Sequence, residues 1–405
     1  MKNPFSARAP SFDAHAINET IQRALASAGL DTTAGPIHGV TETIRRALAA
    51  GGLSDTAVPA PAPASAAASD SVIDVVARVV DPGHDDSEPA LRSDPPSGDA
   101  QASGRFEAHA FSHPAGTRSY KLYVPARASD VPPPMLVMLH GCTQSADDFA
   151  AGTQMNPLAD AHGLLVVYPE QAAHANPSKC WNWFNPQDQL RGAGEPALLA
   201  GLVQDVAARH GADPRRIYVA GLSAGAAMAV ILGETYPELF AAVGAHSGLP
   251  YASAHDIPSA MAAMKGGRSG LAGLKRMPGA GASPRRQVRH ALPLIVFHGD
   301  RDHTVQRANA AEIVQQAEDA RSAETGDDPL RTTTRRATAP GGRSYSVTLH
   351  ADAAGRVHIE SWTLHGAGHA WSGGDATGSY TDGTGPNASA EMLRFFLALP
   401  RGGSA

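Results

Sequence analysis

The chain has 405 residues and a formal net charge of −6, with 33 basic and 39 acidic side chains. Because there is no basic excess, the composition argues against a nucleic-acid-binding protein. No run of about 18 or more apolar residues occurs, so the sequence predicts no membrane-spanning segment. Hydrophobic residues make up 42 % of the chain, which is enough for a sizeable core.

Cysteine usage is low, with only 2 cysteines, Cys142 and Cys180, in the whole chain. Two cysteines are too few for a disulfide-stapled scaffold, and no Cys-x-x-Cys spacing indicates a zinc site. The residues alone leave open whether the two side chains are bonded to each other or remain as two buried thiols.

The N-terminal region contains an internal repeat, residues 17–30 and 40–53. In each copy, apolar residues occupy the first, fifth, eighth and ninth positions, which is the spacing of an amphipathic helix. We therefore predict that residues 1–55 form two paired amphipathic helices. These helices either pack on each other or on the main domain, or they make a granule or surface contact through residues 17–53.

Residues 56–104 are rich in Ala, Pro and Ser and include the run Val58-Pro-Ala-Pro-Ala-Pro-Ala-Ser65. Such a composition cannot bury a core and predicts a semi-rigid linker. From residue 105 the pattern changes to that of a compact α/β domain, which we expect over residues 105–400. This domain opens with two alternating polar and apolar stretches, residues 106–111 and 119–124, that predict a hairpin.

Short apolar runs then alternate with helical stretches. The alternation predicts a mostly parallel central sheet flanked by helices, and functional residues gather at the carboxyl ends of such strands. Residues 251–290 and 325–342 are rich in Gly, Arg and Ser, so we expect surface excursions or parts of a lid there. The predicted strands are 135–139, 164–168, 217–220, 241–245, 294–297 and 357–364, and the predicted helices are 145–162, 196–210 and 224–236.

A candidate nucleophile lies in the motif Gly221-Leu-Ser-Ala-Gly225. An acyl-transfer serine stands on a sharp turn between a strand and a helix, where glycines two residues to either side avoid clashes. In a chain so rich in Gly and Ala, the pattern alone is weak. Its position between a predicted strand and a predicted helix strengthens it, and we predict Ser223 as the nucleophile.

An acid and a base follow in the chain order Ser, Asp, His that α/β-hydrolases use. Asp302 follows a buried strand, where a carboxylate orients a histidine and stabilises its protonated form. Asp300 is the competitor, but it lies nearer the end of the strand. His369 lies in a glycine-rich loop after the last predicted strand, with His365 as its alternative. We predict an α/β-hydrolase in which Ser223 is the nucleophile, His369 the general base and Asp302 the orienting acid.

The loop His140-Gly-Cys-Thr-Gln144 directly follows a predicted strand. In this fold such a loop supplies one amide of the oxyanion hole, and the residue after the nucleophile supplies the other. We predict Cys142 and Ala224 as the donors, with Thr143 as a rival to Cys142. The loss of one donor typically slows catalysis by roughly a hundred- to a thousand-fold.

A metal site is the competing interpretation of the histidines. His365 and His369 have the i, i+4 spacing of a helical zinc pair, and His298, Asp300 and Asp302 cluster in sequence. Gly366 and Gly368 make a helix unfavourable around the histidine pair. We therefore predict that the reaction uses no metal and no cofactor.

The motifs that carry a family resemblance are Leu139-His-Gly-Cys-Thr-Gln144, Cys180-Trp-Asn-Trp-Phe184, Gly221-Leu-Ser-Ala-Gly225, Gly366-Ala-Gly-His-Ala-Trp-Ser-Gly-Gly374 and Gly378-Ser-Tyr-Thr-Asp-Gly-Thr-Gly-Pro-Asn-Ala-Ser389. Together they resemble the poly(3-hydroxybutyrate) depolymerase family of esterases, which borders on the feruloyl and acetyl-xylan esterases. The similarity extends over residues 106–397. It implies the Ser-His-Asp triad given above, an oxyanion donor near Cys142 and a disulfide between Cys142 and Cys180.

The resemblance also implies a substrate, poly- or oligo(3-hydroxybutyrate), hydrolysed through an acyl-enzyme intermediate. Two alternatives are a feruloyl or acetyl-xylan type of carbohydrate esterase and a granule- or surface-binding protein with incidental esterase activity. Trp181, Trp183 and Trp371 lie in or near the motif loops and are predicted to contact an acyl chain, or else to pack beneath the loops. The family suggests an extracellular location. No signal peptide is visible, so a cytoplasmic location stays open.

Overall fold

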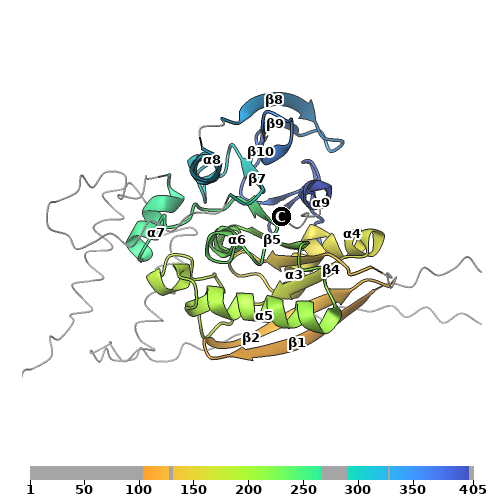
Figure 1. The fold of residues 1–405 in the computed structure, drawn as a ribbon. Coiled ribbons are helices and arrows are strands. Elements are labelled where there is room, and N and C mark those ends of the chain that lie inside the picture. The colour runs from red at the N-terminus through yellow and green to blue at the C-terminus, as the bar shows by residue number, and fades with distance from the viewer. Residues whose placement is uncertain (1–103, 127–130, 267–290, 327–328, 401–405) are drawn as a thin grey trace, which may run out of the picture. The chain divides into compact units, whose positions relative to one another are not determined.

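The computed structural model describes residues 104–126, 131–266, 291–326 and 329–400 (Figure 1). The predicted helices of residues 1–55, their contact surface at residues 17–53 and nearly all of the linker lie outside the described residues. They therefore stay predictions.

Within the described residues, ten strands form one sheet in the order β1-β2-β4-β3-β5-β6-β7-β10-β9-β8. The six central strands are β4, β3, β5, β6, β7 and β10, and they run parallel to one another. The predicted leading hairpin is confirmed, and it forms one antiparallel edge. The strands are β1 (Arg105–His113), β2 (Gly116–Val124), β3 (Met135–Leu139), β4 (Leu165–Pro169), β5 (Ile217–Leu222), β6 (Ala242–His246), β7 (Leu294–Gly299), β8 (Arg331–Thr338), β9 (Ser344–Ala351) and β10 (Val357–Leu364).

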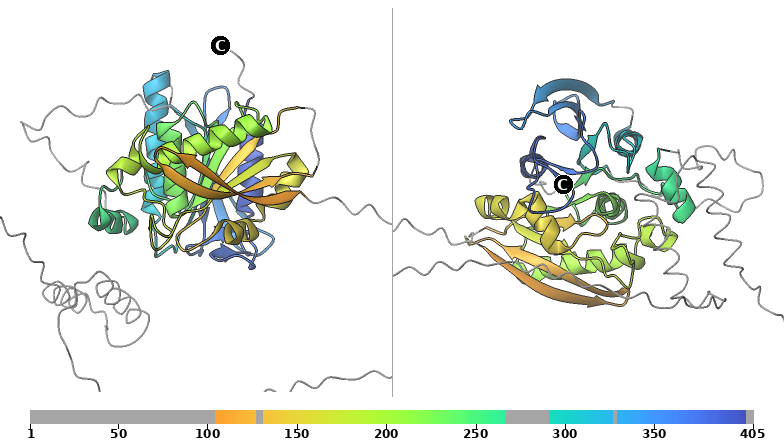
Figure 2. Two further views of the ribbon diagram at one scale, coloured as in Figure 1. Left: turned by 90° about the horizontal axis from the view of Figure 1, so that it is seen from below. Right: turned by 180° about the vertical axis from the view of Figure 1, so that it is seen from behind.

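Helices cover both faces of this sheet (Figure 2), and each face has its own apolar core. Side chains along β3 point alternately to the two faces of the sheet and so join different cores. Val137 and Leu139 belong to the core beneath α5 (Gly194–His210), α6 (Ala224–Thr235) and α8 (Ala308–Thr325). Leu136 and Met138 belong to the core beneath α3 (Ala146–Thr153), α4 (Met155–His162) and α9 (Ala388–Ala398). Because both faces are covered, the central strands consist almost entirely of buried residues. The helices are α3 (Ala146–Thr153), α4 (Met155–His162), α5 (Gly194–His210), α6 (Ala224–Thr235), α7 (Ile257–Met264), α8 (Ala308–Thr325) and α9 (Ala388–Ala398).

Two predictions about secondary structure need correction. The helix expected over residues 145–162 is two helices, because Gln154 adopts a left-handed conformation with φ of 52° between α3 and α4. The stretch 325–342, expected to be a surface excursion, contains the edge strand β8. Its residues are nearly all exposed, so it lacks the apolar alternation of a half-buried strand, and backbone pairing with β9 holds it in place.

The stretch 251–290, expected to be a surface excursion or part of a lid, is described by the structure only in its first part. It contains the short helix α7, and its residues 267–290 lie outside the described part of the chain. Among the helices that the structure describes, none has the length and apolar character needed to cross a membrane.

Candidate active site

Ser223 occupies a sharp turn between β5 and α6. Its φ of 57° and ψ of −120° lie in a region that residues other than glycine rarely adopt. The turn is tied to the neighbouring strand, because Ser223 donates its amide hydrogen to the carbonyl oxygen of His246 at 2.9 Å. A serine on such a strand-to-helix turn presents its hydroxyl at the edge of the sheet.

Gly221 and Gly225 leave no room for side chains around this turn. A Cβ on Gly221 would lie 2.4 Å from the carbonyl carbon of Gly225, and a Cβ on Gly225 would lie 2.1 Å from the carbonyl oxygen of Leu139. The start of α6 therefore packs directly against the end of β3. This close approach places Gly225, the residue after Ala224, against the carbonyl oxygens of Leu139 and His140.

His369 and Asp302 form a hydrogen-bonded pair, with His369 Nδ1 2.7 Å from Asp302 Oδ2. The other carboxylate oxygen of Asp302 accepts hydrogen bonds from the amides of Thr304 at 2.9 Å and Val305 at 2.8 Å. Burial acts to raise the pKa of Asp302, but the hydrogen bond and charge of His369, together with the amide of Val305, hold that pKa below its usual value. Asp302 is therefore a buried carboxylate with a fixed orientation.

The two competitor residues, Asp300 and His365, form a separate pair. His365 Nδ1 lies 2.9 Å from Asp300 Oδ2, and the amide of Gly366 donates to the other carboxylate oxygen at 2.7 Å. On its far side, His365 Nε2 lies 2.8 Å from the hydroxyl of Ser346. Ser346 lies within β9, whose backbone pairs with β10 on one side and β8 on the other. Ser346 therefore belongs to the sheet and lacks the strand-to-helix turn that Ser223 has.

The sheet order brings these groups to one edge. Strands β5, β6, β7 and β10 are consecutive parallel neighbours, so their carboxyl ends meet on the same side. Ser223 follows β5, His246 ends β6, Asp302 follows β7 and His369 follows β10. Four positions spread over about 150 residues of sequence thus share one end of the sheet.

The predicted oxyanion donors, Cys142 and Ala224, differ from the rival Thr143 in whether the backbone amide already donates a hydrogen bond. The amide of Thr143 donates to the carbonyl oxygen of Ser178 at 2.7 Å. Among the residues that the structure describes, neither the amide of Cys142 nor that of Ala224 has a hydrogen-bond acceptor. An amide that is already bonded is a poor oxyanion donor, so this difference favours Cys142 over Thr143.

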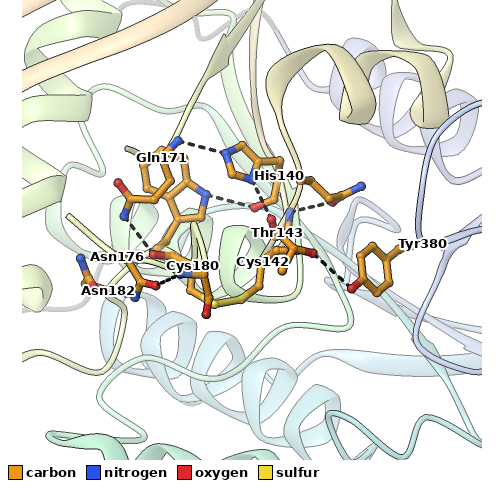
Figure 3. The surroundings of a disulfide bond; sticks show 12 residues. His140, Cys142, Thr143, Gln171, Asn176, Cys180, Asn182 and Tyr380 are labelled. Atoms are coloured by element: carbon orange, nitrogen blue, oxygen red, sulfur yellow. Dashed lines mark hydrogen bonds between the residues drawn. A yellow bond between two sulfur atoms is a disulfide. The ribbon is translucent and has the colours of Figure 1, made fainter. Parts of the chain in front are cut away.

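The loop that carries Cys142 is held by a disulfide to Cys180 (Figure 3). The bond joins the loop after β3 to the loop after β4. The next residue, Trp181, donates its indole hydrogen to the carbonyl oxygen of His140 at 3.0 Å, which adds a second link between the two loops. Figure 3 also shows a hydrogen bond between the hydroxyls of Thr143 and Tyr380, which ties this loop to the C-terminal segment. The two oxygens are 3.2 Å apart.

A buried polar network supports the same loop, and sequence reasoning missed it. His140 Nε2 accepts from the amide of Gln171 at 3.0 Å, and His140 Nδ1 donates to the carbonyl oxygen of Gly141 at 2.7 Å. Burial lowers the pKa of His140, so the ring is neutral and its tautomer is set by these two partners. The Gln171 side chain bonds in turn to Arg118 and Glu195. No sequence signal pointed to this network, because its members are far apart in the chain and lie in polar or glycine-rich surroundings.

The tryptophans predicted to contact substrate lie inside the protein. Trp181 is 0 % exposed, Trp371 1 % and Trp183 6 %, and all three belong to the apolar cores. The Trp371 indole nitrogen also bonds to the hydroxyl of Ser389 at 3.1 Å. Side chains this buried have little surface to offer an acyl chain, so their burial favours the packing alternative.

The histidines considered for a metal site have other partners. His365 pairs with Asp300 and His369 with Asp302, so the two rings serve different carboxylates. Within the described residues, no group of three or more His, Cys, Asp or Glu side chains is arranged to hold a metal ion.

The sequence of this chain is similar to those of known esterases. The family described as Esterase PHB depolymerase matches residues 118–326, just over half of the chain. The chain is 34 % identical over 256 residues to poly(3-hydroxyalkanoate) depolymerase C of Paucimonas lemoignei, covering 62 % of this chain and 58 % of that protein. It is 36 % identical over 142 residues to feruloyl esterase B of Neurospora crassa, covering 35 % of this chain and 47 % of that protein.

A solved structure is similar in fold. Acetyl xylan esterase from Aspergillus awamori aligns with a TM-score of 0.53 and 21 % identity, covering 72 % of this chain and 99 % of that one. The predicted α/β-hydrolase fold is thereby confirmed. The chain spans about half the length of the curated relatives it matches, between 47 and 58 % for the two named above. The chain belongs to the Esterase PHB depolymerase family.

Proposed function

We propose that this chain is a serine ester hydrolase in which Ser223 is the nucleophile, His369 the general base and Asp302 the acid that orients it. The observation that carries the proposal is the pair of His369 and Asp302, 2.7 Å apart, on the sheet edge that also carries the strained turn of Ser223. A strained serine turn on the same sheet edge as an imidazole–carboxylate pair is typical of nucleophilic catalysis.

The proposed reaction begins with attack on the ester carbonyl. His369 donates Nδ1–H to Asp302, which leaves Nε2 as the base that takes the proton from the Ser223 hydroxyl. The serine oxygen bonds to the carbonyl carbon, and the carbonyl oxygen becomes an oxyanion. The amides of Cys142 and Ala224 stabilise that oxyanion, each by roughly 3–4 kcal/mol in comparable sites.

The second half of the reaction releases the acid. As the tetrahedral intermediate collapses, protonated His369 gives its proton to the departing alcohol, and the acyl group stays on Ser223. Water then attacks the acyl-enzyme with His369 again as the base. Collapse of the second intermediate returns the proton to Ser223 and frees the carboxylic acid, so no cofactor enters the balance.

We propose poly- or oligo(3-hydroxybutyrate) as the substrate. The family description and the depolymerase from Paucimonas lemoignei support a hydroxyalkanoate ester. The disulfide between Cys142 and Cys180 supports an oxidising, extracellular setting, because such bonds are rare in reducing compartments. The proposed catalytic unit is residues 105–400.

An acylated carbohydrate is the second candidate substrate. The relatives at 36 % and 29 % identity, named feruloyl esterase B and probable acetylxylan esterase A, favour it. The buried state of the three loop tryptophans is neutral between the two substrates, because none of them offers a large apolar wall.

Hydrolysis of a short p-nitrophenyl ester, of 3-hydroxybutyrate oligomers and of feruloyl and acetyl-sugar esters tests these proposals. The wild type is compared with Ser223→Ala, and Ser346→Ala is the matched control, because its hydroxyl lies 2.8 Å from the competitor histidine His365. We expect the first variant to lose all ester cleavage and the second to keep it. Cleavage that survives in Ser223→Ala would contradict the assigned nucleophile, and the ester that is cleaved fastest decides the substrate class.

A further inference from the structure

His246 lies at the end of β6, between the strand that leads to the nucleophile and the strand that leads to the acid. It is fully buried. Its carbonyl oxygen accepts the amide hydrogen of Ser223 at 2.9 Å. Its imidazole points to a different element, because Nε2 accepts the amide hydrogen of Ser372 at 3.0 Å. One residue therefore contacts the serine turn through its backbone and the histidine loop through its side chain.

The imidazole of His246 packs against two aromatic rings. It stacks on Phe297 with ring centres 5.7 Å apart and planes 9° apart, and on Trp371 with ring centres 5.1 Å apart and planes 25° apart. Its Nδ1 lies 3.2 Å from the hydroxyl of Ser247 and carries the hydrogen, since Nε2 is the acceptor. The ring therefore has a fixed plane, a fixed tautomer and one outward acceptor.

The acceptor remains available over the whole working pH range. Burial lowers the pKa of His246 to about 3, the charges of His298 and His369 act in the same direction, and the charge of Asp302 opposes them. The imidazole is neutral in any buffer well above that value. A protonated ring would have no lone pair at Nε2 for Ser372.

The loop that receives this hydrogen bond is rich in glycine, and its residues 371–373 also bond through their backbone to Tyr380 and Asp382. Residues 365–374 carry both His369 and several glycines, and glycine lowers the stiffness of a loop. Ser372 follows His369 by three residues, and its hydroxyl donates to the carbonyl oxygen of Pro386 at 2.8 Å. The contact from His246 fixes the same residue from the side of the central sheet.

We propose that His246 is a positioning residue that sets the nucleophile and the general base relative to each other. Its carbonyl holds Ser223 in the strained turn, and its imidazole holds the loop of His369 at Ser372. The proposal rests on the triad proposed above and adds a residue that does not touch the reacting atoms. A misplacement of about 1 Å between reacting groups slows a reaction by about a hundred-fold, so one hydrogen bond in this place matters for rate.

Three substitutions of His246 test the contribution of its hydrogen-bond acceptor separately from that of its aromatic ring. His246→Gln keeps an oxygen acceptor near the position of Nε2, His246→Phe keeps an aromatic ring without an acceptor, and His246→Asn reaches only the position of Nδ1. His350→Phe is the matched control, because His350 is also buried but bonds to Glu318 at 2.8 Å, away from the triad.

The first readout is kinetic. For a soluble p-nitrophenyl ester we expect His246→Phe to lower kcat by about 10- to 100-fold with KM changed little, and His246→Gln to recover most of that loss. His246→Asn should behave like the Phe variant, and His350→Phe should keep the wild-type kcat. The proposal is overturned if His246→Phe keeps the wild-type kcat, or if His246→Gln loses as much as His246→Phe.

The second readout is amide hydrogen exchange at Ser372, which needs no substrate. We expect faster exchange in His246→Phe than in the wild type, and protection close to wild type in His246→Gln. If the wild type cleaves no ester, the proposed function fails, but exchange still decides whether His246 anchors the loop. Equal exchange in the Phe and Gln variants would overturn the anchor.

Discussion

The Nδ1 atom of His365 lies 2.9 Å from Oδ2 of Asp300, as that of His369 lies 2.7 Å from Oδ2 of Asp302. Two imidazole–carboxylate pairs thus connect the end of β7 to the loop after β10. The amide of Gly366 adds a further hydrogen bond to Asp300 at 2.7 Å. The pair of Asp300 and His365 braces the loop, whereas the pair of Asp302 and His369 is the one that we assign to catalysis.

Substitution of the two aspartates should therefore have unequal effects. Asp302→Asn removes the charge that fixes the His369 tautomer, and in comparable triads such a change lowers kcat by about 10⁴-fold. Asp300→Asn leaves that charge in place, so we expect a loss of less than about 10-fold. Steady-state kinetics on a soluble ester measures both. A larger loss in Asp300→Asn would reverse our assignment of the acid.

The charge on Asp302 should also appear in the pH dependence of stability. Its folded pKa is depressed, so its contribution is fully present above the unfolded pKa of about 4 and is lost as the pH falls through the folded pKa. We expect the free energies of unfolding of the wild type and Asp302→Asn to differ most near pH 6 and to converge below about pH 4. Urea unfolding over this range measures the difference.

Asp205→Asn is the control for this experiment, because Asp205 forms an exposed pair with Arg209 at 2.6 Å. Such a pair contributes less than about 1 kcal/mol. A difference between the wild type and Asp302→Asn that stays constant from pH 6 to pH 3 would rule out the assigned pKa shift.

The disulfide should contribute strongly to stability. It joins residues 38 apart in sequence, and loop-closure entropy for that length gives an upper figure of about 4 kcal/mol. We expect the double variant Cys142→Ala/Cys180→Ala to unfold with a free energy lower by about 2–4 kcal/mol. Its kcat should fall as well, because the loop that presents the Cys142 amide loses an anchor.

A reducing agent provides the control for that variant. It should destabilise the wild type by a similar amount and leave the double variant unchanged. Equal free energies of unfolding for the oxidised wild type and the double variant would show that the bond contributes nothing.

The glycines of the nucleophile turn should tolerate no side chain. In Gly225→Ala the new Cβ would lie 2.1 Å from the carbonyl oxygen of Leu139, and relieving that clash should cost about 3 kcal/mol or more. Gly211→Ala is the matched control, because its Cβ would meet nothing within 4 Å, and its φ of +60° should cost only about 1 kcal/mol. Urea unfolding compares the two. Equal losses in the free energy of unfolding would mean that the turn accommodates the Gly225→Ala methyl group without a steric penalty.

Local patterns in the sequence predicted the central elements of the fold well. Buried strands such as Met135–Leu139 and Ile217–Leu222 are short apolar runs between helices, and the sheet needs such runs because helices cover both faces. Edge elements were harder to predict. Strand β8 is stabilised by pairing with β9 rather than by apolar burial. The break at Gln154 is flanked by Gly152 and Pro157, a signal that the prediction of one continuous helix did not use.

The sequence by itself determined the strand-turn-helix around Ser223, because strand, glycine and helix signals lie within a few residues of one another. It also determined the chain order of Ser223, Asp302 and His369. Only the tertiary structure decided which aspartate meets which histidine. Asp300 and Asp302 are two residues apart, and the path of the loop chooses between them.

The tertiary structure alone also decided the packing of the residues around the site. Burial of Trp181 and Trp371, and the dual contact of His246 with Ser223 and Ser372, depend on how distant strands and loops pack. Side-chain type and spacing carry no record of such contacts, because they join residues of different strands and loops that meet only at a shared edge of the sheet.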